Sequence, residues 1–346
     1  MRKLYINEIQ EYADQFTSCR SLRDFEKLGI DTNLVQLQSL NPSYYTFKLK
    51  KKNGGYRTIE APCNELKSLL KKFNKYLQCV YYINQSNSSY GYIITPKKMT
   101  SIKNILGNAT THLGCNYLLN VDFQDFFHQI DKQRIYRLFV GTPFYFEQKV
   151  AHIFSNLFTY KGRLPMGTPT SPNLSNFCTL GLDHKLEVWS NNNECKYSRF
   201  VDDLSFSSEA LPFINDHYNQ IKAICESNNF KINPNKVKYF NDDKTKKITG
   251  LLLRDTVDIE DDFYKQLDKD LKRMAALVEV ATILKRRDCN EDISAFKQEI
   301  DGQINFIGMI EGYGSTQFNE YRRKLKKAMH PSEEVLSVRW MNYNYM

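Results

Sequence analysis

The sequence predicts an α+β fold in which helices cover one face of an antiparallel sheet. A strand-like run, Leu118 to Val121, ends at Asp122, and two further strand-like runs flank the pair Asp202 and Asp203. Helix-like segments separate and follow these strands, which is typical of a layered α+β arrangement. In such a sheet a strand end and a hairpin tip can lie side by side although they are far apart in the sequence.

The elements before the first aspartate are helical with one hairpin. Residues 1–40 have helical periodicity, and the segment 65–81 predicts a helix with one apolar face. Between them, KKNGGYRTIEAP (51–62) predicts a hairpin with Asn53, Gly54 and Gly55 at its tip.

The elements after the first aspartate alternate between helices and strands. A Gly/Pro loop from residue 162 leads into a long helix to 189, with Ser171 as its predicted N-cap and Pro172 at its first position. After the Asp-Asp hairpin we expect a helix at 213–228, strands at 230–232 and 247–253, and an amphipathic helix through 263–278.

The composition indicates a polyanionic partner. The 346 residues carry 48 Lys and Arg against 39 Asp and Glu, a net charge of +9, with 22 Tyr and 22 Phe. Basic residues interleaved with aromatics suit a nucleic acid, whose phosphates they neutralise and whose bases they stack on. The alternative is an ordinary solvated basic surface.

The same composition argues against secretion and against the membrane. No apolar run approaches the roughly 20 residues that span a bilayer, and the first residues lack the apolar stretch of a secretory signal. The eight cysteines contain no C-x-x-C pair. Scattered cysteines in a long chain are typical of reduced thiols, so we expect a cytoplasmic protein.

The pair Asp202 and Asp203 occupies a turn without glycine, although two-residue hairpins favour Asn-Gly or Asp-Gly. One interpretation is a solvated turn, in which acidic side chains bond nearby backbone. The other is a set of hard oxygen ligands for divalent cations such as Mg²⁺, which requires a third carboxylate. Asp122 is the candidate for that third ligand.

Five segments carry a resemblance to a known family. Three of them resemble the palm motifs of reverse transcriptases, in the family's order: NVDFQDFF (120–127), LPMGTPTSPNLSN (164–176) and YSRFVDDLSFS (197–207). Two more, NATTH (108–112) and ITGL (248–251), resemble signatures of the bacterial retron-type enzymes. The chain differs from the family pattern at Met166, where glutamine is usual, and at Phe200, where tyrosine is usual. The resemblance extends loosely over most of the chain.

The resemblance implies a right-hand polymerase fold of fingers, palm and helical thumb. The implied order is an N-terminal helical extension (1–45), fingers (46–115), first part of the palm (116–134), connection of fingers and palm (135–170), second part of the palm (171–256), and thumb with the C-terminal RNA-binding region (257–346).

The resemblance also implies the catalytic residues. Two Mg²⁺ ions, which Mn²⁺ could replace, would be held by Asp122, Asp202, Asp203 and the main-chain carbonyl of Phe123. Lys236 matches the lysine that protonates departing pyrophosphate in such polymerases, and its alternative is a surface lysine. The nearby Asp125 is expected to lie outside the metal site.

Further positions are implied to bind substrate. Arg57, with Lys50, would grip the triphosphate, and Phe127 would exclude a 2′-hydroxyl. Gly167 would support the template and the incoming base. Phe200 and Val201 would lie beside the primer end. Phe127 could instead be a core aromatic, and Arg57 a solvated charge.

Four residues are implied to contact RNA. Asn108 and His112 belong to a segment that is either structural or RNA-facing. Arg322 and Arg323 lie in a basic C-terminal helix that would follow the template–primer duplex, or would simply be solvated.

The implied function is an RNA-directed DNA polymerase that uses dNTPs and a cognate structured non-coding RNA. It would start from an RNA 2′-hydroxyl, form a branched RNA–DNA product, and act in anti-phage defence with a separate effector protein and no membrane. One alternative is another bacterial defence-associated reverse transcriptase, protein-primed or untemplated. Another is a catalytically silent RNA-binding scaffold. RNA synthesis is disfavoured by the bulk of Phe127.

Overall fold

The computed structural model describes residues 3–50, 54–99, 103–241, 245–283 and 290–330. Asn53 of the predicted hairpin tip and residues 331–346 of the predicted thumb lie outside these ranges. The chain divides into two compact units, Met1–Lys244 and Thr245–Met346.

The helices of the first unit enclose a core of phenylalanine rings. This core brings together α1 (Ile6–Thr17), η1 (Leu22–Leu28), α3 (Asn64–Asn84), α5 (Lys132–Val140) and α6 (Gln148–Phe158), while α2 (Thr32–Leu40) packs on α6. Phe16 on α1 lies 5.3 Å from Phe25 and 6.0 Å from Phe144, measured between ring centroids. The N-terminal helices are therefore part of this core, and the predicted helix at 65–81 is confirmed as α3.

The predicted hairpin is confirmed, and it is hydrogen-bonded to the Gly/Pro loop. Strands β1 (Tyr44–Lys50) and β2 (Tyr56–Pro62) pair antiparallel. The main-chain N–H of Glu60 donates to the carbonyl of Met166 at 2.7 Å. Arg163 also holds the Glu60 carboxylate with two hydrogen bonds of 2.8 and 3.0 Å.

The central sheet is antiparallel, as predicted, and it has four strands. Its order is β4 (Lys196–Phe200), β5 (Asp203–Ser208), β3 (Tyr117–Asp122) and β6 (Lys238–Phe240). The strand expected at 230–232 is wrong, because only Ile232 forms an isolated bridge, to Phe123. The chain turns at once into η3 (Pro234–Lys236), where the proline has no N–H to continue a ladder.

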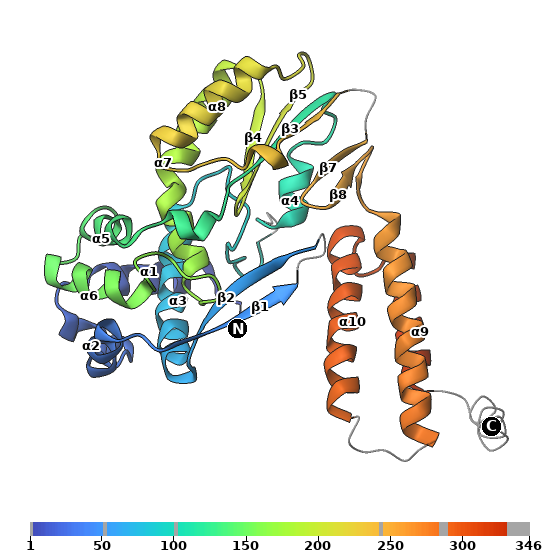
Figure 1. Ribbon diagram of the computed structural model, residues 1–346, viewed down its shortest axis with the longest axis horizontal. Coiled ribbons are helices and arrows are strands. Elements are labelled where there is room, and N and C mark those ends of the chain that lie inside the picture. Colours follow the sequence, from blue (N-terminus) through green and yellow to red (C-terminus); the bar gives the residue numbers. More distant parts are fainter. Residues whose placement is uncertain (1–2, 51–53, 100–102, 242–244, 284–289, 331–346) are drawn as a thin grey trace. The chain divides into compact units, whose positions relative to one another are not determined.

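One face of this sheet packs against α7 (Ser171–Asn192), which α8 (Asn215–Ser227) contacts in turn (Figure 1). Successive side chains of a strand point to opposite faces. Tyr197 and Phe206 face α7, where Trp189 contacts the Phe206 ring edge-on at 5.6 Å. The opposite face carries Asp122 and Asp203.

The start of α7 differs by one residue from the prediction. Thr170 is the N-cap and the helix begins at Ser171. The Ser171 hydroxyl donates to the carbonyl of Pro165 at 2.7 Å, so this side chain fixes the preceding loop.

The second unit combines a small sheet with three helices. The strands are β7 (Lys246–Ile248), β8 (Leu251–Leu253) and β9 (Val257–Ile259), and the helices are α9 (Asp261–Ile283), α10 (Asn290–Glu311) and α11 (Thr316–Met329). The single strand expected at 247–253 is in fact two, because Thr249 and Gly250 both take positive φ and form a tight turn. The amphipathic α9 is confirmed. Within the described ranges, no helix has both the length and the apolar character needed to cross a membrane.

Candidate active site

Two aspartates lie opposite each other at the ends of the two central strands of the sheet. Asp122 is the last residue of β3, and in the antiparallel register it pairs with Asp203, the first residue of β5. Residues directly opposite each other on neighbouring strands have their side chains on one face, where like charges are destabilising. This arrangement brings two of the predicted metal ligands together on the face opposite α7.

The third aspartate lies in the turn between β4 and β5. Phe200 pairs with Asp203, so the two central residues of the turn are Val201 and Asp202, and the expectation that the Asp-Asp pair forms the turn is wrong by one residue. The main-chain N–H of Phe123 donates to the carbonyl of Asp202 at 3.1 Å. This hydrogen bond ties the turn to the segment that follows Asp122.

Val201 takes a backbone conformation that normally requires glycine. Its φ is 63°, and a β-branched residue in the left-handed region is strained. Its side chain packs against Gly91, where an added Cβ would lie 2.7 Å from the Val201 Cγ2 atom. The turn is therefore held by tertiary contacts, as strained functional segments are.

The charges at the three carboxylates are poorly compensated. Burial, followed by repulsion from Asp202 and Asp122, raises the pKa of Asp203 to about 7. Burial and Asp122 also raise the pKa of Asp202, against the opposing charges of Lys236 and Arg57. The site thus disfavours its own fully ionised form.

Lys236 supplies one positive charge. Its Nζ lies 2.8 Å from the Oδ1 atom of Asp122. The lysine ends the η3 turn, which begins after Asn233, and the Asn233 N–H donates to the Asp122 carbonyl at 2.8 Å. Burial alone would lower the pKa of Lys236, but the hydrogen bond and charge of Asp122 raise it.

The donor chemistry of the three carboxylates fits a hard divalent cation, which binds carboxylate oxygens. Such a cation would offset the burial and the mutual repulsion that raise the pKa values of Asp202 and Asp203. Across the described part of the chain, however, no group of three or more His, Cys, Asp or Glu side chains is already arranged around a single point. Asp122, which would be one ligand, is engaged by Lys236. Asp125, expected outside the metal site, is an exposed residue before η2 (Phe126–Gln129).

Arg57 and Lys50, the two residues predicted to hold the triphosphate, lie on different faces of the β1–β2 hairpin. Arg57 is exposed on β2, and its charge acts on the pKa of Asp202, which places it in electrostatic reach of the site. Lys50 pairs with Tyr56, the neighbour of Arg57, so Lys50 and Arg57 lie on opposite faces of the hairpin. The two side chains therefore leave the hairpin in opposite directions.

Phe127 and Gly167 have distinct surroundings. Phe127 is half-buried, 5.5 Å from the core ring of Phe126. Gly167 has φ 128°, and a Cβ there would lie 2.8 Å from the Cγ2 of Ile59 and 3.0 Å from the Glu60 carbonyl. Only glycine lets the loop approach β2 this closely.

Asn108 and His112 lie in the interior, which does not fit the expectation that they face RNA. Asn108, in α4 (Ile105–Thr110), is 1% exposed, and His112 is 0% exposed. The His112 ring bonds Ser207 at 2.6 Å and Ser198 at 2.7 Å. This segment therefore fastens α4 to strands β4 and β5, as the structural alternative proposes.

The remaining predicted RNA contacts lie in the second unit. Arg322 and Arg323 are exposed on α11. Arg322 forms an ion pair with Asp301 at 2.6 Å.

The segment SSYGY (88–92) lies beside the site although no sequence motif predicted it. The carbonyl of Ser88 accepts from the Arg199 N–H at 2.8 Å, and the Tyr90 N–H donates to the Arg199 carbonyl at 2.9 Å. Burial and the charge of Asp202 raise the pKa of Tyr92, so this ring lies near the site. The only signal in the sequence was a glycine between two tyrosines, a pattern that suits close backbone approach.

Comparison with known proteins identifies the family. The model of the family described as reverse transcriptase (RNA-dependent DNA polymerase) matches residues 49–253, more than half of the chain. The retron Ec86 reverse transcriptase of Escherichia coli is 27% identical over 313 residues, which cover 89% of this chain and 90% of that protein. The retron Mx65 reverse transcriptase of Myxococcus xanthus is 24% identical over 82% of this chain and 66% of that protein. For the retron Ec83 reverse transcriptase of Escherichia coli the identity is 25%, over 63% of this chain and 71% of that protein. These matches confirm the predicted polymerase fold, and the chain belongs to the reverse transcriptase family as a retron-type RNA-directed DNA polymerase.

Proposed function

We propose that this enzyme synthesises DNA on a cognate structured non-coding RNA, starting from a 2′-hydroxyl of that RNA and leaving a branched RNA–DNA product. The observation that carries the proposal is the placement of Asp122 opposite Asp203, with Asp202 in the adjoining turn. Similarity to retron reverse transcriptases over most of the chain supports the choice of template and primer.

Asp122, Asp202, Asp203 and the carbonyl of Phe123 would hold two Mg²⁺ ions, or Mn²⁺ in their place. When bound, such ions stabilise the charge on the attacking and leaving oxygens of an in-line displacement at phosphorus. The raised pKa values of Asp202 and Asp203 support this role, because a bound cation would favour their ionised forms.

The substrate roles follow from position and chemistry. Arg57, within electrostatic reach of Asp202, would hold the triphosphate of a dNTP with its planar guanidinium. Phe127 would lie against the sugar and exclude a 2′-hydroxyl, and Phe200 and Val201 would border the primer end. Lys236 would transfer a proton from Nζ to the departing pyrophosphate.

We assign the parts of the chain by the same logic. The β1–β2 hairpin belongs to the fingers, the four-stranded sheet with α7 belongs to the palm, and helices α9, α10 and α11 of the second unit form the thumb. Arg322 and Arg323 would contact the RNA backbone from that unit. The enzyme would act in the cytoplasm, in anti-phage defence alongside a separate effector protein.

The test is to purify the protein from its native locus and to identify the nucleic acid that accompanies it. The nucleic acid is treated with DNase, RNase and debranching enzyme, beside an Asp202→Asn, Asp203→Asn double variant. We expect a discrete DNA joined to RNA by a 2′–5′ bond, absent from the variant. DNA without that branch would overturn the priming proposal, and RNA alone in both preparations would indicate a binding scaffold.

A further inference from the structure

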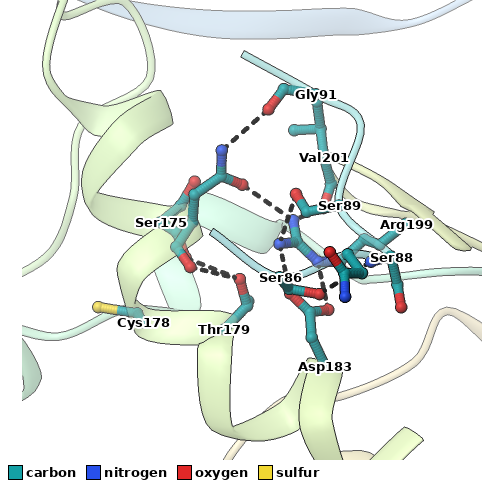
Figure 2. Close-up of polar contacts among 12 residues, drawn as sticks. Ser86, Ser88, Ser89, Gly91, Ser175, Cys178, Thr179, Asp183, Arg199 and Val201 are labelled. Carbon is teal, nitrogen blue, oxygen red and sulfur yellow. Dashed lines mark hydrogen bonds and ion pairs between the residues drawn. The ribbon is translucent and has the colours of Figure 1, made fainter. Parts of the chain in front are cut away.

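Arg199 is a fully buried arginine whose side chain uses every hydrogen-bond donor that it has (Figure 2). The guanidinium carries five N–H groups in a fixed plane. Nε and Nη2 donate to the two oxygens of Asp183 at 2.8 and 2.7 Å, and Nη2 donates again to Ser89 at 3.1 Å. Nη1 donates to the Oδ1 of Asn176 and to the carbonyl of Val201, both at 3.0 Å.

These acceptors belong to three separate parts of the first unit. Asp183 and Asn176 are on α7, Ser89 is in the segment SSYGY, and Val201 is in the turn. The backbone adds to the connection, because the Asn176 Nδ2 donates to the carbonyl of Gly91 at 2.9 Å. A buried network with all members paired is rigid, since any displaced member leaves an unsatisfied polar group.

The network ends one residue from a proposed metal ligand. Val201 holds a φ of 63° against its own steric preference, and its carbonyl is bonded by Arg199. The Val201 side chain packs on Gly91, which Asn176 fixes from α7. Asp202 follows directly, so the orientation of its carboxylate depends on a turn conformation that Arg199 and Asn176 hold.

We propose that Arg199, with Asp183 and Asn176, forms a positioning network that sets the geometry of Asp202 for metal binding. This inference rests on the proposed role of Asp202 as a metal ligand. Asp183 neutralises and orients the guanidinium, and Asn176 and the Val201 carbonyl share its Nη1 group. A lysine at position 199 has three donors on a single nitrogen and could not replace the five hydrogen bonds that the planar guanidinium donates.

A purely structural network would make a different prediction. Its loss would lower stability while the folded fraction kept normal metal binding and turnover. A positioning network predicts instead that a folded variant binds metal more weakly and turns over more slowly, because a small misplacement of a reacting group is costly.

The decisive comparison is between two buried asparagines on α7. Asn176→Ala removes one acceptor of Arg199 and the hydrogen bond to Gly91, and leaves the Arg199–Asp183 ion pair intact. Asn173→Ala is the matched control, since Asn173 is equally buried but bonds Asn74 at 2.8 Å, outside the network. Arg199→Lys and Asp202→Asn complete the set.

Two measurements are made on each full-length variant that melts in one cooperative transition. The first is Mn²⁺ affinity, from the electron paramagnetic resonance signal of the free ion without nucleotide. The second is kcat, the KM for dTTP and the Mg²⁺ dependence on a poly(rA) template with an oligo(dT) primer. We expect Asn176→Ala and Arg199→Lys to lower kcat by between about 10-fold and 100-fold, with weaker Mn²⁺ binding and a smaller change in KM. Asn173→Ala should keep wild-type values.

The outcomes separate this inference from the proposed function. If Asn176→Ala folds and matches Asn173→Ala in kcat and Mn²⁺ affinity, the positioning network is overturned. That conclusion holds even where Arg199→Lys fails to fold. If Asp202→Asn itself retains activity and Mn²⁺ binding, the proposed metal site is wrong, and the inference falls with it.

Discussion

Asp122 and Lys236 meet at the end of β3, where the lysine Nζ lies 2.8 Å from the carboxylate Oδ1. The two are also joined through the backbone, because Asn233, at the start of the turn that carries Lys236, donates to the Asp122 carbonyl at 2.8 Å. The amine is thus fixed beside the three carboxylates, and its charge partly opposes the burial and the acidic neighbours that raise the pKa values of Asp202 and Asp203.

If Lys236 acts as a general acid, a variant that keeps its positive charge but cannot donate a proton should still lose activity. Lys236→Ala should lower kcat by about 100-fold or more, the usual contribution of a general acid. Lys236→Arg keeps a cation beside Asp122 but cannot release its proton at neutral pH, so it should lose a similar factor. Single-turnover rates of dNTP incorporation measure both.

The control for this prediction is Lys231→Ala, which removes an exposed lysine from the segment before the same turn. It should leave kcat at the wild-type value. Recovery of normal turnover in Lys236→Arg would show that only the positive charge matters, and the proton-transfer role would then be wrong.

Phe127 is proposed to discriminate between sugars. Its ring is half-buried and contacts Phe126, which belongs to the core, so one edge remains available to a substrate. Phe127→Ala should reduce the ratio of kcat/KM for dTTP over UTP by at least about 10-fold, because the space for a 2′-hydroxyl is no longer blocked. An unchanged ratio would leave Phe127 as a core aromatic.

A side chain at position 167 should clash with β2, and the same substitution at Gly162 serves as the control for backbone strain. Gly167→Ala would place a Cβ 2.8 Å from Ile59 and 3.0 Å from the Glu60 carbonyl, and would strain a backbone with φ 128°. Gly162→Ala, in the same loop, meets only the positive φ of 77°, since nothing among the described residues lies within 4 Å of its Cβ.

Both alanine variants should be destabilised by about 1–3 kcal/mol from backbone strain, which urea unfolding measures. Only Gly167→Ala should also raise the KM for dNTPs, because it pushes the β1–β2 hairpin and Arg57 away from the site. Equal KM values in the two variants would contradict this role of the loop.

Local patterns were sufficient to predict the strand β3 and the helix α3. The strand ending at Asp122 follows an apolar run, and the apolar face of α3 follows its helical period, so each could be derived from a short window. The layered sheet arrangement then allowed Asp122 to lie beside the distant hairpin, and the resemblance implied a shared metal site, neither of which a short window contains.

The turn and the segment SSYGY could not be derived in this way. Local chemistry puts acidic residues in the turn and disfavours Val201 at positive φ. The observed register depends on Gly91 and Arg199, which are distant from one another in the sequence. Sequence alone left two positions open for His112 for the same reason, because its two serine partners lie on strands far along the chain.

His112 predicts how stability depends on pH. Burial, with a smaller contribution from the charge of Lys196, lowers the pKa of His112 to about 3, whereas an unfolded histidine titrates near 6.5. The folded state therefore stays neutral at this group while the unfolded state takes up a proton. The contribution of His112 to the free energy of unfolding is therefore complete above pH 6.5. It decreases as the pH drops toward 3, by up to about 1.4 kcal/mol per pH unit.

Replacing His112 should remove its contribution to the dependence of the unfolding free energy on pH. His112→Gln loses the ring that bonds Ser198 and Ser207, so we expect it to be less stable than wild type at pH 8. The difference in unfolding free energy between wild type and His112→Gln should then narrow between pH 6.5 and 5, because only the wild type loses stability through this group. Urea unfolding across that range measures it, with His184→Gln, an exposed histidine of α7, as the control that should keep the wild-type slope. Parallel pH profiles of wild type and His112→Gln would mean that His112 is protonated equally in the folded and unfolded states, which would contradict the effect of its complete burial.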